Sequence, residues 1–91
     1  MSTRLPPGLV VLSREGCGLC HDMLAGLAEL ERDQSIPAVK IIDVDSDPDL
    51  ARQFGLKVPV LLLDGSVICH YTLNSKELLR LVARSPAIIP R

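Results

Sequence analysis

The residues of this chain best suited to chemistry are Cys17 and Cys20, the two ends of the tetrapeptide Cys17-Gly18-Leu19-Cys20. An apolar run at residues 9–12 precedes them and predicts a buried strand, and residues 19–30 have the pattern of an amphipathic helix. Two thiols three positions apart at a helix start can meet as a disulfide, and the free backbone N–H groups there favour a thiolate. This combination is typical of thiol–disulfide exchange.

The composition allows one domain with one core, because 47% of the 91 residues are apolar. Ten Lys and Arg residues against eleven Asp and Glu residues give a formal charge of −1, and their scatter along the chain argues against a nucleic-acid surface. No apolar run approaches the roughly 18 residues that cross a bilayer, and the N-terminus does not resemble a secretory signal. Three cysteines, an odd number, disfavour a disulfide-stapled secreted domain. We therefore expect a cytoplasmic monomer with no membrane or nucleic-acid partner.

The elements that follow the helix are marked by capping and turn residues. Residues 39–44 predict a second strand, and Asp47-Pro48 predicts the start of a short helix that Gly55 closes. Residues 58–63 predict a third strand. Asp64-Gly65 then separates it from a fourth strand at residues 66–71, which indicates a hairpin with a type I′ turn.

The C-terminal part of the chain predicts one more helix and a tail. Asn74 is placed to cap the helix, and Glu77 three positions later completes a capping box. Residues 85–91 contain two prolines and are expected to form a loose tail of a single domain that spans residues 1–91.

The predicted order of elements is β-α-β-α-β-β-α, an α/β fold. The first two strands are joined by a helix, so we expect them to be parallel with a right-handed crossover, whereas the last two form an antiparallel hairpin. The compact solution is a mixed four-stranded sheet flanked by three helices. The first strand is apolar throughout, which indicates a central strand covered on both faces.

These features resemble the small glutaredoxin-like members of the thioredoxin-fold superfamily. The resemblance is carried by residues 13–20 after the first strand, by Val58-Pro59 at the start of the third strand, and by the Asp64-Gly65 hairpin. They stand in the family's order and cover almost the whole chain. The resemblance implies a thioredoxin-like fold with a dithiol–disulfide active site.

The resemblance also assigns roles to residues of the site. It implies that Cys17 attacks a substrate disulfide and that Cys20 resolves the mixed disulfide. It implies that the Val58–Pro59 bond is cis and faces the cysteines, so that Val58 can pair with an incoming chain and Pro59 presents no N–H group there. Arg14 matches the basic residue that glutaredoxins commonly carry three positions before the nucleophile. It would raise the positive potential near the thiolate or contact a substrate carboxylate, and the alternative is a solvated loop charge.

The sequence departs from glutaredoxins in two places. Gly18-Leu19 replaces the usual proline inside the motif, so the redox potential does not transfer. Residues 69–72 contain no glycine where glutaredoxins hold glutathione with a Gly-Gly pair and an acid, and bulkier side chains there predict a narrower groove. We expect no bound cofactor, with glutathione as the one co-substrate that the resemblance suggests. Val11 stands where thioredoxins bury an acid that helps to deprotonate the resolving cysteine.

Two cofactor hypotheses compete with a disulfide site. The pattern Cys17-x-x-Cys20-His21 is also that of c-type haem attachment, which needs an exported chain and usually a distant Met ligand. Cys17, Cys20 and Cys69 with His21 or His70 would make a zinc site, although we expect Cys69 to lie far from the helix start. An iron–sulfur cluster shared between two subunits is related to this second hypothesis.

Cys69 itself has a simpler interpretation. We expect it to share one face of the fourth strand with Val67, while Ile68 and His70 take the other face. A single cysteine in a strand is usually a small buried hydrophobe, and the alternative is a reactive third thiol.

The function predicted from the sequence is reduction of protein or low-molecular-weight disulfides by the Cys17/Cys20 dithiol, which an unidentified reductant restores. The alternative is a thioredoxin-fold binding or redox-sensing module whose cysteines do not catalyse turnover.

Overall fold

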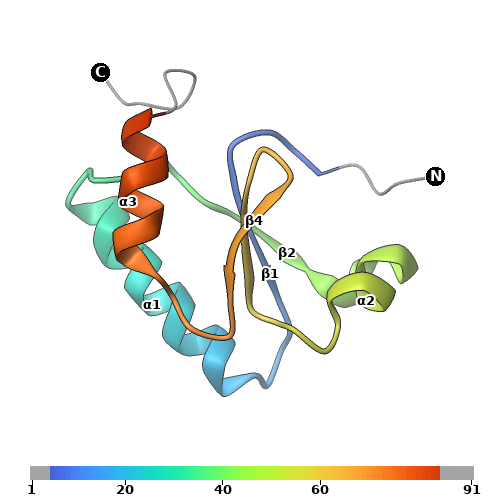
Figure 1. Cartoon of the computed structure of the whole chain (residues 1–91). Helices are drawn as coiled ribbons and strands as arrows, with labels where there is room; N and C mark the ends of the chain where they lie inside the picture. The colour runs from blue at the N-terminus through green and yellow to red at the C-terminus, as the bar shows by residue number, and fades with distance from the viewer. Residues whose placement is uncertain (1–4, 85–91) are drawn as a thin grey trace.

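A computed structural model of the chain describes residues 5–84 (Figure 1). Residues 1–4 and the predicted tail at residues 85–91 lie outside the described residues. The predicted order of strands and helices is confirmed, with one short 3₁₀ helix, η1, added after the second strand. The elements are β1 (Leu9–Ser13), α1 (Gly18–Arg32), β2 (Lys40–Asp43), η1 (Val44–Ser46), α2 (Pro48–Phe54), β3 (Val60–Leu63), β4 (Ser66–His70) and α3 (Ser75–Arg84).

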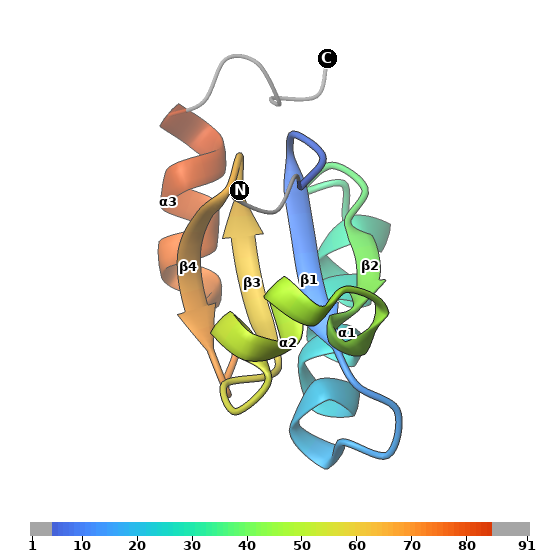
Figure 2. The ribbon, with the colours of Figure 1, turned by 90° about the vertical axis from the view of Figure 1, so that its right-hand side faces the viewer.

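The four strands form one mixed sheet in the order β2-β1-β3-β4. β1 runs parallel to β2 and antiparallel to β3, and β3 runs antiparallel to β4. Helices α1 and α3 lie together on one face of the sheet and α2 lies on the other (Figures 1 and 2). The predicted α/β class and thioredoxin-like architecture are therefore confirmed.

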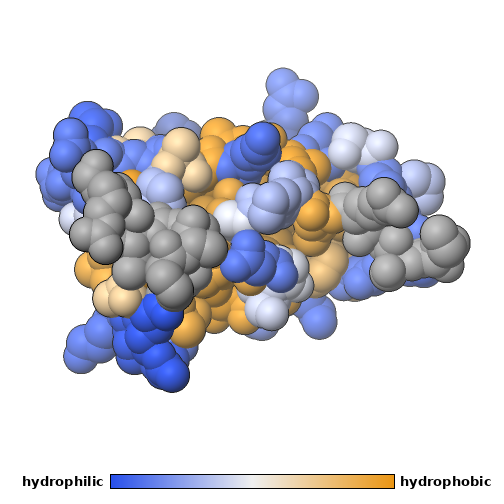
Figure 3. Space-filling model, turned by 90° about the horizontal axis from the view of Figure 1, so that it is seen from above, coloured by the Kyte–Doolittle hydropathy of each residue, from blue (hydrophilic) through white to orange (hydrophobic). Residues whose placement is uncertain are grey.

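The core has two layers because side chains of β1 alternate between the two faces of the sheet. Leu9 and Val11 pack with Met23 and Leu27 of α1, and Val10 and Leu12 belong to the layer beneath α2. All four apolar residues of β1 are at most 2% exposed, as expected of a central strand. Figure 3 views the molecule from the end of the sheet opposite the cysteine pair. In this view apolar residues occupy a middle band, and hydrophilic residues surround it.

The hairpin turn between β3 and β4 has the predicted geometry. Asp64 and Gly65 have φ angles of 50° and 86°, and two consecutive positive φ angles define the type I′ turn. The turn is also tied to the start of β1, because Asp64 Oδ1 accepts a hydrogen bond of 2.7 Å from the Gly8 N–H group.

A β-bulge in β4 overturns the predicted alternation of that strand. Leu61 pairs with Cys69 whereas Leu62 pairs with Val67, so Ile68 is the additional residue. As a result Ile68 and Cys69 both pack against the layer beneath α1 and α3. The prediction that Cys69 shares a face with Val67 is therefore wrong, because the extra residue shifts the two-residue period.

The two predicted helix starts differ in how completely they are capped. The Asp47 side chain accepts a hydrogen bond from the Asp49 N–H group, and Pro48 is the first residue of α2, as predicted. At α3, Asn74 Oδ1 accepts a hydrogen bond of 3.1 Å from the Glu77 N–H group. The Glu77 carboxylate binds Arg80 instead of returning to the Asn74 backbone, so only half of the predicted capping box forms.

Candidate active site

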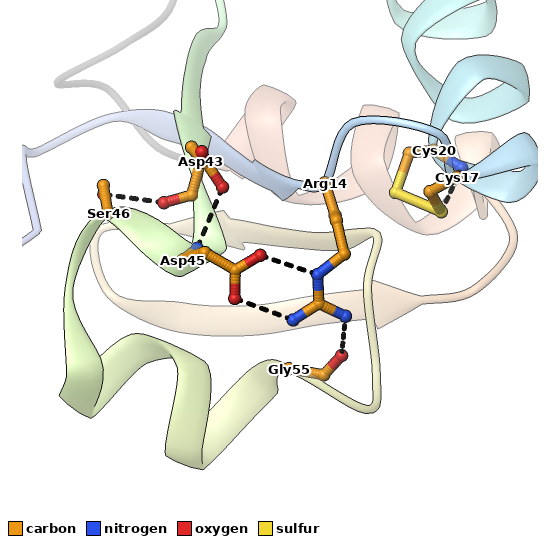
Figure 4. Close-up of polar contacts among 7 residues, drawn as sticks. All are labelled: Arg14, Cys17, Cys20, Asp43, Asp45, Ser46 and Gly55. Atoms are coloured by element: carbon orange, nitrogen blue, oxygen red, sulfur yellow. Dashed lines mark hydrogen bonds and ion pairs between the residues drawn. A yellow bond between two sulfur atoms is a disulfide. The ribbon is translucent and has the colours of Figure 1, made fainter.

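Cys17 is the N-cap of α1, and Cys20 lies one turn into the helix. The two cysteines form a disulfide with a Cα–Cα distance of 5.2 Å, and the Cys17 Sγ accepts a hydrogen bond of 3.1 Å from the Cys20 N–H group (Figure 4). Cys17 is partly exposed, whereas Cys20 is 1% exposed. A free N–H group and the positive end of the helix dipole both point at the Cys17 sulfur, and they would stabilise a thiolate after reduction.

Arg14 fixes the loop that leads to Cys17. Its Nε donates to Asp45 Oδ2 at 2.8 Å, its Nη2 donates to Asp45 Oδ1 at 2.9 Å, and its Nη1 donates to the Gly55 carbonyl at 2.8 Å. The guanidinium extends toward η1 and the end of α2, away from the cysteine pair (Figure 4). The hydrogen bonds between the two side chains lower the pKa of Asp45 and raise that of Arg14.

The sequence did not predict this triple contact, because the two interpretations of Arg14 were a role beside the thiolate or a substrate and a solvated loop charge, and Asp45 was given no partner. The available signal was only a pair of opposite charges near two predicted strand ends. That Arg14 also contacts a substrate remains a prediction.

Because β1 and β3 are antiparallel, the start of β3 lies at the same end of the sheet as the end of β1. Leu12 pairs with Val60, which places Pro59 beside Ser13, the residue from which the loop to Cys17 departs. The Val58–Pro59 bond is cis, the isomer that the family resemblance implies. Within residues 5–84, neither backbone polar group of Val58 has a hydrogen-bond partner in the chain.

Tyr71 lies at this same end of the sheet, and nothing in the sequence analysis marked it as part of the site. Its backbone N–H group donates to the Pro59 carbonyl at 2.8 Å, and its hydroxyl donates to the Leu56 carbonyl at 3.1 Å. Its φ angle is +70°, which ends β4 and turns the chain toward α3. A positive φ at a tyrosine is uncommon, so nothing in the residue type announces it. With Leu19, Tyr71 lines a small cavity of about 240 Å³ beside α1.

A groove of about 350 Å³ reaches the cysteine pair from the side of β2 and is lined by residues 13–17, 20, 21, 24, 41 and 43. A larger cavity of about 430 Å³ lies beneath α2 and is lined by Leu5, Leu50 and Phe54 among others. The groove of about 350 Å³ is the candidate site, because the larger cavity has no cysteine among its described lining residues.

The competing metal hypothesis finds no support in the geometry. Among residues 5–84, no three or more His, Cys, Asp or Glu side chains are grouped so that they could hold a metal ion. The zinc set drawn from Cys17, Cys20, Cys69 and a histidine is therefore not assembled. Cys69 is half-buried beside α3, and burial raises the pKa of its thiol.

Comparison with known proteins decides the family. Residues 8–83 match the model of the glutaredoxin-like domain (DUF836). The chain belongs to this glutaredoxin-like family. Uncharacterized proteins of Mycobacterium tuberculosis and Mycobacterium bovis are 33% identical to it over 84 positions, which cover 87% of this chain and 86% of theirs.

Solved structures agree with the family assignment. A solution structure of a Nitrosomonas europaea protein, 33% identical, covers 89% of this chain and 98% of its own length with a TM-score of 0.70. An X-ray structure of an X. campestris protein, 25% identical, covers 87% of this chain and 100% of its own length with a TM-score of 0.66. Glutaredoxin C1 from poplar shares the fold, with a TM-score of 0.54 at 17% identity over 89% of this chain and 79% of its own. Within residues 5–84, no helix of this chain is long and apolar enough to cross a membrane.

Proposed function

We propose that this glutaredoxin-like protein is a thiol–disulfide oxidoreductase that reduces protein or low-molecular-weight disulfides. One observation carries the proposal: a partly exposed cysteine at a helix N-cap, Cys17, is joined by a disulfide to a buried cysteine, Cys20, one turn further on. The more exposed Cys17 suits the role of nucleophile, and the buried Cys20 suits the role of the cysteine that resolves the mixed disulfide.

The reaction proceeds in two exchanges that balance. The Cys17 thiolate attacks one sulfur of the substrate disulfide, which forms a mixed disulfide and releases one substrate thiolate. Cys20 then loses its proton and attacks the Cys17 Sγ, which releases the second substrate thiolate and forms the Cys17–Cys20 disulfide. The substrate gains two electrons and the protein loses two. An external thiol, with glutathione as one candidate, returns the pair to the dithiol form.

The Val58–Pro59 segment before β3 is where we propose that the substrate chain binds. The unpaired N–H and C=O groups of Val58 suit a short backbone pairing with the segment that carries the substrate cysteine. Arg14 holds the loop before Cys17 through Asp45 and Gly55, and we propose that it serves the substrate by holding Cys17 in place. A reducing compartment such as the cytoplasm would keep the dithiol available.

The test is a single-turnover reaction between the pre-reduced protein and bis(2-hydroxyethyl) disulfide. Alkylation of the unfolded chain and mass spectrometry report the outcome, because the reduced chain accepts three alkyl groups and the oxidised chain only one, at Cys69. We expect Cys17→Ser to abolish the reaction and Cys20→Ser to accumulate one mercaptoethanol adduct on Cys17. Cys69→Ser is the matched control and should react at the rate of the unmodified protein.

The same reaction separates catalysis from a non-catalytic redox-sensing module. With dithiothreitol as reductant and insulin as protein disulfide, a catalyst turns over many times. If Cys17→Ser and Cys20→Ser both match the unmodified protein under these conditions, the chain is not an oxidoreductase of this kind.

A further inference from the structure

The groove on the β2 side of the cysteine pair is apolar at its base. Ile41 of β2 is 63% exposed although it stands in the middle of a strand, and Leu24 of α1 lies beside it. β2 is an edge strand, and the register that pairs Ile41 with Val11 turns Ile41 toward the face covered by α1. Aliphatic surface therefore lies next to Cys17 and Cys20, open to a ligand.

The rim of this groove is acidic. Glu15 and Asp43 line it, and within residues 5–84 neither carboxylate forms an ion pair. The only arginine in the lining, Arg14, is matched by the two-point contact with Asp45. With Arg14 paired to Asp45, Glu15 and Asp43 are the carboxylates of the described lining that stand without an ion pair, and they make the rim negative. A charged cleft of one sign concentrates ligands of the opposite sign.

We propose that this groove selects cationic disulfides, in particular polypeptides with Lys or Arg beside the reacting cysteine. This inference rests on the proposed oxidoreductase function and names its substrate class. The methylene stem of the basic side chain lies on Ile41 and Leu24, and its ammonium or guanidinium group lies between Glu15 and Asp43. The neighbouring substrate sulfur then meets Cys17 at the end of the groove.

The experiment compares three small disulfides that differ in charge: cationic cystamine, neutral bis(2-hydroxyethyl) disulfide and anionic 3,3′-dithiodipropionate. Each second-order rate constant with the reduced protein is divided by that of dithiothreitol with the same disulfide, which removes the intrinsic reactivity of the leaving thiol. Alkylation and mass spectrometry provide the readout, since the chain has no tryptophan.

We expect the normalised rate to be greatest for cystamine and least for dithiodipropionate. In Glu15→Gln/Asp43→Asn the cystamine rate should fall about three- to tenfold, the neutral disulfide should change less than about twofold, and the anionic disulfide should react faster. Raising the salt concentration should shrink the preference in the unmodified protein, because exposed charges are screened. Asp22→Asn removes one charge from α1 outside this groove and is the matched control, with no change in preference.

Asp43 Oδ1 accepts a hydrogen bond from the Asp45 N–H group, so Asp43→Asn could disturb η1. The single variant Glu15→Gln leaves this hydrogen bond intact and tests the same charge preference. Equal normalised rates for the three disulfides, or an equal change in all three in the variants, would overturn the inference while the oxidoreductase function stands. If no disulfide is reduced by the unmodified protein, the proposed function fails and the substrate class fails with it.

Discussion

The Arg14 guanidinium binds the Asp45 carboxylate at two points, 2.8 Å from Nε to Oδ2 and 2.9 Å from Nη2 to Oδ1, across 31 positions of sequence. This geometry is the strong fork-to-fork form of an arginine–carboxylate contact. These two bonds tie the loop before Cys17 to η1, and a third bond, to the Gly55 carbonyl, ties it to the end of α2. The loop that leads to Cys17, the proposed nucleophile, is thus held by Asp45 of η1 and by Gly55 at the end of α2.

The pair should be visible in the titration of Asp45. The hydrogen bond from Arg14 lowers the pKa of this carboxyl below its ordinary 3.8, and Arg14→Gln should return it toward that value. Because the folded-state pKa is the lower one, the pair contributes stability above the ordinary carboxyl pKa and loses it as the pH falls through the folded value. Carbon-detected NMR of the Asp45 carboxyl measures its titration midpoint in the unmodified protein and in Arg14→Gln. Arg52→Gln, which removes a different arginine–aspartate pair, should leave the Asp45 midpoint unchanged.

Gly55 is required by close approach. A Cβ at this position would collide with the Ala51 carbonyl and lie 3.2 Å from Nη2 of Arg14. Since the Ala51 contact is with backbone, the helix end must shift, and we expect Gly55→Ala to lower the free energy of unfolding by about 1–3 kcal/mol. Denaturant unfolding of the oxidised protein is the measurement. Gly18→Ala is the control, because a Cβ there meets nothing within 4 Å; an equal midpoint for the two variants would contradict the steric explanation.

Gly65 is required by backbone conformation instead. Its φ is +86° and a Cβ would meet nothing within 4 Å, so Gly65→Ala should cost about 1–2 kcal/mol through the left-handed conformation alone. Asn tolerates this conformation better than Ala, so Gly65→Asn should recover much of the loss. The same denaturant midpoints test it. No recovery by Asn would mean that the turn is not the source of the loss.

The order of elements followed from the sequence because local signals agreed with each other. The apolar run of β1, the Asp47-Pro48 start of α2 and the Asp64-Gly65 turn each specify one conformation without help from distant residues. The family resemblance followed from the spacing between the cysteine motif and Val58-Pro59. The match of residues 8–83 of the chain to the family model supports it.

The site was less predictable because its missing parts depend on tertiary contacts. The bulge at Ile68 has no glycine to mark it and shows only in the register between β3 and β4. The partner of Arg14 is 31 positions away, and the backbone turn at Tyr71 is stabilised by bonds to Pro59 and Leu56. Such contacts form only after the sheet has brought its strand ends together.

Cys69 offers the last prediction, because it is the thiol that the proposed reaction does not use. It packs against the layer beneath α1 and α3, and burial raises the pKa of its thiol above the ordinary value of 9.0. A raised pKa means a smaller thiolate fraction at every pH below it, and only the thiolate reacts readily with iodoacetamide. Cys69 should therefore be alkylated slowly in the folded chain, with a rate that still climbs as the pH passes 9.0.

The measurement uses Cys17→Ser/Cys20→Ser, in which Cys69 is the remaining cysteine, and follows iodoacetamide labelling by mass spectrometry. Unfolding this variant in urea exposes the thiol and provides the matched control, so labelling at neutral pH should become faster. A folded-state rate equal to the unfolded one, or a rate that levels off well below pH 9, would show that burial does not suppress this thiol. Cys69 would then be a reactive third thiol, able to compete with Cys17 for the same disulfides.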